Sequence, residues 1–157
     1  MNAMENPANP IRVRRATIAD VTQLSELLSR LFAQEAEFEP NAARQTRGLR
    51  LILEQPELGH IYCALASERI VGMVSILFTV STAEGGRAAW LEDMIVHPEL
   101  RGRGIGKQLL NEAIRCGREN GCKRITLLTD DANGEAMRFY APADFVRSRM
   151  VPFRLKL

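Results

Sequence analysis

The first third of the chain contains two segments in which apolar residues recur at helical spacing. In the first segment these residues are Ile18, Val21, Leu24, Leu27, Leu28 and Leu31. Their spacing places them on one face of a helix, and Thr17 with Asp20 forms a capping-box-like start. The pattern therefore predicts a first helix here. A second helix is predicted from about Ala42 to Glu54, after an acidic and irregular segment that ends at Pro40.

The middle of the chain is rich in β-branched and apolar residues, which favour strands. Residues 60–67 and 70–80 are predicted to form an antiparallel pair, because only a short Glu-Arg turn separates them. Gly72 within the second of these strands predicts either a bulge or close packing. A short strand at 11–15 is predicted before the first helix, and a central strand at about 88–96 follows the antiparallel pair.

The second half of the chain predicts a strand, a loop, a helix and another strand in succession. Apolar residues from Ile105 to Ile114 lie on one helical face, and the helix is predicted to end at Asn120-Gly121. With a strand at 123–129, this order fits a right-handed crossover between two parallel strands. The remaining predicted elements are a last helix that starts between Asp130 and Asn133 and ends at Pro142, and strands at 144–151 and 152–157.

These elements together predict one mixed α/β domain. A chain of 157 residues suits a single domain with a sizeable core. The domain is expected to span residues 11–157. Residues 1–10 are expected to form a short flexible N-terminal arm.

Composition narrows the class of protein. The chain is 46% apolar and 25% charged with a net charge of +2, so binding to nucleic acid or to membranes is not expected as its main activity. No apolar run approaches the roughly 18 residues of a membrane helix, and the N-terminus lacks the regions of a signal peptide. Cys63, Cys116 and Cys122 include no C-x-x-C pair, which argues against a disulfide framework. We therefore expect a cytoplasmic protein with no metal site.

Candidate chemistry lies between Trp90 and Leu110, where an apolar strand leads into a glycine- and arginine-rich loop and then a helix. A loop of this kind binds anions, because free backbone N–H groups and the positive end of the helix dipole meet there. Glycines let the backbone approach a ligand and adopt positive φ angles; they are Gly102, Gly104 and Gly106. Positive side chains surround the same place: Arg101, Arg103 and Lys107. The loop is predicted to hold a phosphate or pyrophosphate.

Two familiar phosphate-binding loops do not fit this segment. A Walker A loop would need glycine where Arg101 stands and Ser or Thr where Gln108 stands. The dinucleotide fingerprint fails because Lys107 occupies the position of its third glycine. The pattern that fits is Arg-x-x-Gly-x-Gly, at Arg101, Gly104 and Gly106, directly after the acidic strand. It resembles the acyl-CoA-binding motif of the GNAT superfamily of N-acetyltransferases.

The last predicted helix contains a second part of the resemblance. Asn133, Ala136, Tyr140 and Phe145 are similar to the family spacing Asn-x-x-Ala-x-x-x-Tyr-x-x-x-Gly-Phe. Asp144 stands where the family usually has glycine. Because Asp tolerates the left-handed conformation better than most residues, the turn is expected to be kept.

The resemblance implies a single domain with a central, twisted, mixed and mostly antiparallel sheet that has helices on both faces. It also implies acetyl-CoA as cosubstrate, with the pyrophosphate of coenzyme A held by the loop amides. The implied cofactor-binding residues are Met94, Ile95 and Val96 through their backbone, then Arg101, Gly102, Arg103, Gly104, Ile105, Gly106 and Lys107, and finally Asn133 and Tyr140.

Acetyl transfer to an amine requires a base for the amine proton and benefits from an acid for the departing thiolate. No Ser or Cys with a base partner stands out, so direct attack in a ternary complex is predicted. Tyr140 is the predicted general acid, with a core tyrosine packed beside Phe139 as the alternative. Glu92 is the predicted base, directly or through water. Strand alternation sends Glu92 and Asp93 to opposite faces unless a bulge intervenes.

The predicted function is therefore an N-acetyltransferase that acts on a primary amine. Glu92 and Asp93 are predicted to bind this acceptor, although Asp93 could instead be the base or form a structural ion pair. Small-molecule, peptide and protein-lysine acceptors all remain open at this point. The acidic segment with Glu35, Glu37 and Glu39 could rim a pocket for a cationic acceptor or be an ordinary exposed loop.

Two other classes of protein share part of this pattern. A non-catalytic acyl-CoA-binding sensor or regulatory domain would keep the loop without depending on Tyr140. A nucleotide-binding protein of another fold is disfavoured by the two failed fingerprints. The resemblance also allows a homodimer, to which residues 146–157 could supply an edge strand. His97, which precedes Pro98, is interpreted as a turn residue.

Overall fold

The computed structural model describes residues 10–35 and 37–157. The chain separates into two units, one up to residue 127 and the other from 128 to 157. Most of the expected N-terminal arm, residues 1–10, lies outside the described residues, and only Pro10 of that arm is described.

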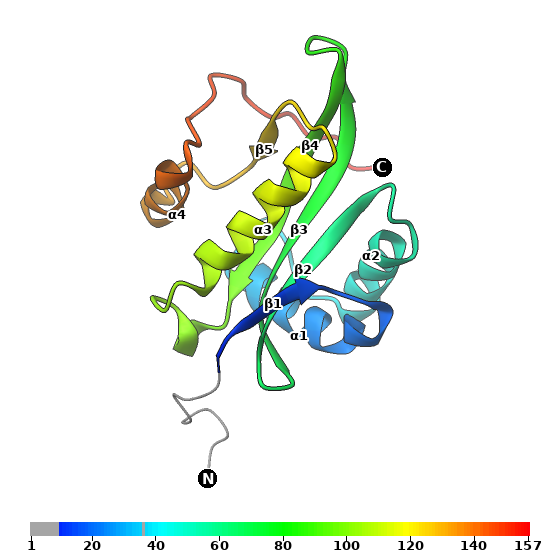
Figure 1. The fold of residues 1–157 in the computed structure, drawn as a ribbon, viewed down its shortest axis with the longest axis vertical. Helices are drawn as coiled ribbons and strands as arrows, with labels where there is room; N and C mark the ends of the chain where they lie inside the picture. Colours follow the sequence, from blue (N-terminus) through cyan, green and yellow to red (C-terminus); the bar gives the residue numbers. More distant parts are fainter. Residues whose placement is uncertain (1–9, 36) are drawn as a thin grey trace. The chain divides into compact units, whose positions relative to one another are not determined.

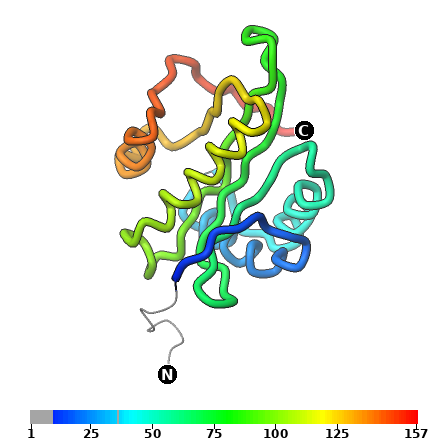
Figure 2. The backbone as a smooth tube through the Cα atoms, viewed as in Figure 1, coloured from blue at the N-terminus to red at the C-terminus, as the bar shows by residue number. Residues whose placement is uncertain are grey.

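A sheet of five strands in the order β1-β2-β3-β4-β5 forms the centre of the first unit (Figure 1). The strands are β1 (Arg12–Arg15), β2 (Gly59–Ala66), β3 (Arg69–Ser81), β4 (Gly86–Val96) and β5 (Ile125–Leu127). The first three pairings are antiparallel and the pairing of β4 with β5 is parallel. The expected mixed, mostly antiparallel sheet is confirmed. β3 and β4 form a long hairpin, drawn in green (Figure 2).

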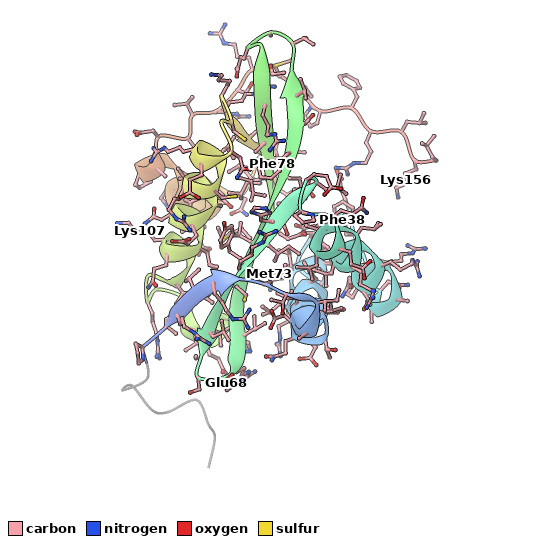
Figure 3. The ribbon with its side chains drawn as sticks, turned by 45° about the vertical axis from the view of Figure 1, so that its right-hand side comes forward. Phe38, Glu68, Met73, Phe78, Lys107 and Lys156 are labelled. Atoms are coloured by element: carbon pink, nitrogen blue, oxygen red, sulfur yellow. The ribbon has the colours of Figure 1, made fainter. Side chains whose placement is uncertain are left out.

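Helices cover both faces of this sheet. Helices α1 (Val21–Phe32) and α2 (Ala42–Glu54) contribute to a buried core that contains Met73 of β3, labelled in Figure 3. The neighbouring residue Gly72 instead faces α3 (Ile105–Glu119), since a Cβ atom there would lie 3.0 Å from Leu109 and 3.5 Å from Ile105. Adjacent strand residues point to opposite faces, so the two groups of helices lie on opposite sides. The close-packing alternative predicted for Gly72 is confirmed.

The predicted capping box forms at the start of the first helix. The backbone N–H and hydroxyl of Thr17 donate to Oδ2 of Asp20 at 2.7 Å and 3.2 Å. Arg14 of β1 pairs with the same carboxylate at 2.8 Å. A short 3-10 turn, Ile18–Asp20, separates this cap from α1, so the helix proper begins later than the apolar pattern suggested.

The predicted strand at 123–129 is shorter in the structure and forms only β5. Its pairing with β4 is confined to Ala89, Trp90 and Leu91. The residues before it belong to the turn after α3, where the N–H of Cys122 donates to the carbonyl of Gly117 at 2.9 Å. The parallel pairing that defines a strand therefore begins only at Ile125.

The second unit contains α4 (Gly134–Tyr140) followed by a 3-10 turn, Ala141–Ala143. The strands predicted at 144–151 and 152–157 are wrong, because these residues form no regular element. Their residues alternate as strand residues do, but a strand also needs a neighbour that accepts and donates its backbone hydrogen bonds. No such neighbour pairs with them in the described chain.

Candidate active site

A β-bulge interrupts β4 at the acidic pair. Met73 pairs with Ile95 and Ser75 pairs with Glu92, so β4 has one residue more than β3 over this stretch. Asp93 lies within the bulge and has a φ of 53°, a left-handed conformation that non-glycine residues seldom adopt. The bulge breaks the alternation that would otherwise place Glu92 and Asp93 on opposite faces.

The bulge gives the two carboxylates different environments. Glu92 is exposed, whereas Asp93 is partly buried. Burial, together with the nearby negative charges of Glu92 and Glu35, raises the pKa of Asp93 to about 7. The hydroxyl of Ser75 donates to the Asp93 carboxylate at 3.5 Å and works against this shift. Asp93 can thus gain or lose a proton near neutral pH.

The edge of β4 that faces β5 is open beyond the short parallel pairing. That pairing ends at Leu91, so the backbone from Glu92 to Val96 has no strand partner on this side in the described chain. Ile95 is anchored in the core, while Met94 and Val96 are partly buried. Apart from the Val96 carbonyl, which accepts from Arg101, the open edge leaves peptide groups of this stretch available to an extended ligand. This fits the predicted backbone role of Met94–Val96.

A 3-10 turn, Pro98–Leu100, connects β4 to the glycine-rich loop. Gly102 and Gly104 have φ angles of 74° and 77°, and a Cβ atom at either position would meet nothing within 4 Å. Glycine is therefore required at these positions by backbone conformation rather than by crowding within the chain. Gly106 lies in the first turn of α3, so the expectation of a positive φ is wrong for this glycine.

The N-terminus of α3 is left without a side-chain cap. The N-cap residue Gly104 has no side chain to offer, and the first turn contains no acidic residue. By contrast, the side chain of Asn41 caps α2 by accepting from the N–H of Arg44 at 2.9 Å. The first amides of α3 and its positive dipole end are thus available to an external anion.

The positive residues of the loop differ in their contacts. The guanidinium of Arg101 donates to the carbonyl of Val96 at 3.2 Å and to Oε1 of Gln34 at 3.5 Å. It therefore links the end of β4 to the residues after α1. Arg103 and Lys107 are exposed, and Lys107 is seen on α3 in Figure 3. Ile105, also among the predicted residues, is buried against Gly72 and anchors the start of α3.

His97 is buried at the end of β4, which its interpretation as a turn residue did not anticipate. It is 6% exposed, and its Nδ1 atom has no hydrogen-bond partner among the described residues. Burial and the charges of Arg30 and Arg69 lower its pKa. Burial thus favours the neutral imidazole, which fits a packing role for His97 at the end of β4. The apolar strand that precedes His97 was the available signal for its burial.

The second unit contains the other two predicted residues. The side-chain oxygen of Asn133 accepts from the N–H of Ala136 at 3.0 Å and so caps α4. The Tyr140 ring lies 4.9 Å from that of Phe139 and 5.6 Å from that of Phe145. Burial raises the pKa of Tyr140 to about 12. The packing proposed as the alternative for Tyr140 is thus present, and it is compatible with a proton-donating hydroxyl.

Asp144 adopts the left-handed conformation expected of it. Its φ is 64°, and its N–H donates to the carbonyl of Ala141 at 3.0 Å. The turn after α4 therefore keeps its shape without the glycine that is usual in the family.

Metal ligands, cysteines and apolar helices were each considered in the sequence, and the structure describes all three. In residues 10–35 and 37–157, no group of three or more His, Cys, Asp or Glu residues could hold a metal ion. Cys63, Cys116 and Cys122 are free thiols. None of the helices in the described part of the chain is both long and apolar enough to cross a membrane.

Comparison with known proteins matches these features to one family. The model of the acetyltransferase (GNAT) family matches residues 21–145, which include the bulge, the loop and α4. The chain belongs to this family.

Curated relatives cover different shares of the chain. Glucosamine 6-phosphate N-acetyltransferase of Trypanosoma brucei brucei is 33% identical over 86 residues, which cover 54% of this chain and 56% of the relative. Aminoalkylphosphonate N-acetyltransferase of Salmonella typhimurium is 27% identical and is aligned over 94% of this chain and 93% of its own length. The chain thus spans about half of the first relative and nearly all of the second.

A solved structure supports the fold. A predicted acetyltransferase from Clostridium acetobutylicum, solved with acetyl-CoA, has a TM-score of 0.76 and 21% identity. The similarity covers 92% of this chain and 96% of that one.

Proposed function

We propose that this protein is an N-acetyltransferase that moves an acetyl group from acetyl-CoA to a primary amine by direct attack in a ternary complex. The observation that supports this most strongly is the uncapped N-terminus of α3 beside the open edge of β4. Membership of the acetyltransferase family points the same way.

The residues present fit coenzyme A. The amides from Gly102 to Lys107 would hold its pyrophosphate, with Arg103 and Lys107 adding positive charge. The backbone of Met94–Val96 would bind the pantetheine arm through the open strand edge. Asn133 is proposed to contact the same arm through its amide nitrogen, since its oxygen already caps α4. When bound, acetyl-CoA supplies the acetyl group as a reactive thioester.

The base is proposed to be one of the two carboxylates at the bulge. Glu92 was the predicted base, and its exposed position suits proton transfer to water. Asp93 has the stronger support, because burial and the charges of Glu92 and Glu35 raise its pKa to about 7, and a base is most effective when its pKa is near the working pH. In this proposal Asp93 takes the proton of the amine, and Glu92 attracts the cationic acceptor.

Tyr140 is proposed to donate its proton to the departing sulfur. The reaction forms a bond between the amine nitrogen and the acetyl carbon and breaks the bond between that carbon and sulfur. The sulfur leaves with the electron pair and takes a proton from the Tyr140 hydroxyl. With a pKa of about 12, this hydroxyl is protonated at neutral pH and available to donate.

The acceptor is proposed to be a small, cationic primary amine. The relatives are named for glucosamine 6-phosphate and for aminoalkylphosphonates, which are small amines. The charge of Glu35 raises the pKa of Asp93, so these two carboxylates lie near one another. With Glu92, three carboxylates would face the ammonium group of the acceptor. We also propose that the protein acts in the cytoplasm as a homodimer, with its three free cysteines in keeping with a reducing compartment.

Calorimetric titration with acetyl-CoA, coenzyme A and ATP tests the cosubstrate. We expect micromolar binding of acetyl-CoA and coenzyme A and none of ATP. An acetylation screen then follows with glucosamine 6-phosphate, aminoalkylphosphonates, diamines and a lysine peptide. Acetyl-CoA binding without turnover of any amine would favour the non-catalytic sensor. The absence of acetyl-CoA binding would refute the proposed function.

A further inference from the structure

The residues that follow α1 continue its last turn. The N–H of Gln34 donates to the carbonyl of Leu31 at 2.9 Å, and the N–H of Glu35 donates to that of Phe32 at 3.3 Å. α1 contacts β4, and Leu31 and Phe32 pack against the core that contains Ile95 of that strand. The turn with Gln34 and Glu35 is therefore fixed next to the second half of β4.

Arg101 joins this turn to the end of β4. Its Nε atom donates to the carbonyl of Val96 at 3.2 Å, and its Nη2 atom donates to Oε1 of Gln34 at 3.5 Å. Its backbone N–H donates to the carbonyl of Pro98 at 3.3 Å. Because a guanidinium is planar and rigid, the bond to Val96 also sets the place at which Gln34 meets its donor.

Glu35, next to Gln34, acts on the base proposed above. The charged groups that raise the pKa of Asp93 are Glu92 and Glu35, and the hydroxyl of Ser75 opposes them. Glu92 adjoins Asp93 on β4 and Ser75 lies on β3, so the sheet itself fixes both. Glu35 instead comes from the turn after α1. Its distance from Asp93 therefore depends on what holds that turn.

We propose that Gln34 is a positioning residue for the amine acceptor. Its bond to Arg101 holds Glu35 beside Asp93, so that both carboxylates face the ammonium group of the acceptor. This inference rests on the proposed function, which it deepens by naming the contact that assembles the acceptor site. It also gives Arg101 a role toward the acceptor, in addition to its place in the glycine-rich loop.

The surroundings of Gln34 favour this role over a purely structural one. Its side chain is exposed, so it fills no space in the core, and a single exposed polar contact adds little to stability. The ring of Phe38, labelled in Figure 3, lies 5.7 Å from that of Phe32 and fastens the following residues to α1. The bond of Gln34 fastens the turn to β4 instead.

Titration of the Asp93 carboxyl tests the positioning without any need for activity. Its carboxyl-carbon NMR signal is followed with pH in the full unliganded chain and is assigned by its absence in Asp93→Asn. Wild-type Asp93 should titrate at a pKa of about 7, and Gln34→Ala should lower that pKa, because Glu35 then moves away. The matched control is Gln55→Ala, the same substitution at the residue that follows α2; it should leave the pKa unchanged. An unchanged pKa in Gln34→Ala would overturn the proposal.

A second substitution shows whether Gln34 acts through Glu35. Glu35→Gln removes the charge and should itself lower the pKa of Asp93. If Gln34 works by placing that charge, Gln34→Ala should produce no further fall in the Glu35→Gln background. An equal fall in both backgrounds would contradict the proposal, because Gln34 would then act on Asp93 by another route.

Kinetics on the same variants separate this proposal from the proposed function. Gln34→Ala should raise KM for the amine by about two- to fivefold and move the rise of kcat/KM to lower pH. Its dissociation constant for acetyl-CoA should equal that of wild type, because the loop amides are unchanged. Absence of turnover in the wild-type protein would refute only the function, since the Asp93 titration still decides the positioning. Turnover by wild type with an unchanged amine KM in Gln34→Ala would refute only the positioning role.

Discussion

Asp93 has a left-handed backbone and a partly buried carboxylate, and both result from the bulge in β4. The bulge fixes its backbone at a φ of 53°, and the same distortion holds its carboxylate beside Ser75 and partly away from water. Such strained and partly buried residues are concentrated at functional sites. Both properties favour Asp93 over Glu92 as the base.

Replacement of Asp93 by Asn should remove the pH dependence of the reaction near neutrality. Because the base must be deprotonated, wild-type kcat/KM should rise with pH through about 7, the pKa of Asp93. Asp93→Asn should lower kcat/KM by about 10²–10⁴-fold and abolish that rise. A full pH–rate profile of both proteins with one acceptor measures this.

Glu92→Gln is the matched control for this prediction. Since the charge of Glu92 raises the pKa of Asp93, its removal should move the rise in activity to lower pH without abolishing it. If Glu92→Gln instead removes the rise and Asp93→Asn leaves it, Glu92 is the base.

Tyr140 should matter for turnover rather than for binding. Tyr140→Phe keeps the packing against Phe139 and Phe145 but removes the proton donor. We expect kcat to fall by about 10²-fold or more, with the dissociation constant for acetyl-CoA nearly unchanged by calorimetry. The chain's other tyrosine, Tyr62 of β2, gives the control Tyr62→Phe. Equal turnover in the Tyr140 and Tyr62 variants would show that Tyr140 is only a packing residue.

The residue types at the site could be predicted from the sequence, but their environments could not. The acidic pair and Tyr140 were evident as candidates. The bulge that distinguishes Asp93 from Glu92 depends on pairing with β3, which alternation along a single strand does not specify. The burial of His97 and the part played by Ser75 likewise depend on neighbours distant in sequence.

At the scale of elements, the loop glycines offer a test of anion binding with a closely matched control. Gly104 and Gly85 have φ angles of 77° and 63°, and neither would crowd a Cβ atom. Replacing either by alanine should thus cost a similar free energy of unfolding, about 1–2 kcal/mol. Only Gly104→Ala alters the N-terminus of α3 and should weaken acetyl-CoA binding, by about tenfold or more.

Denaturant unfolding and calorimetry of the two variants measure these effects separately. A similar loss of stability with binding reduced only in Gly104→Ala is the expected result. Equal binding by both variants would place the pyrophosphate elsewhere.

Elements with strong periodicity were predicted well from the sequence. The predicted second helix has the bounds of α2, and the helix after the loop ends where Asn120-Gly121 indicated. Both ends are set by local features, a side-chain cap at Asn41 and a left-handed glycine at 121. The strands predicted after Asp144 were wrong because a strand depends on a partner, and partners are not encoded locally.

At the scale of the whole molecule, ligand binding should appear as stability. A ligand that binds only the folded state stabilises it by about 2.7 kcal/mol at 100 times its dissociation constant. For a chain of this size, that corresponds to a rise in Tm of about 5–10 °C. Coenzyme A should act nearly as well as acetyl-CoA, because the loop is proposed to bind the pyrophosphate that both contain.

ATP is the informative comparison in this thermal experiment. It also offers phosphates to the N-terminus of α3, but it lacks the pantetheine arm that would occupy the open edge of β4. We therefore expect ATP to give no rise in Tm at concentrations at which coenzyme A raises it. Gly104→Ala should lose most of the coenzyme A effect while Gly85→Ala retains it. If ATP stabilised the protein as much as coenzyme A, the strand edge would contribute nothing to binding. The anion site would then have to be assigned to a nucleotide.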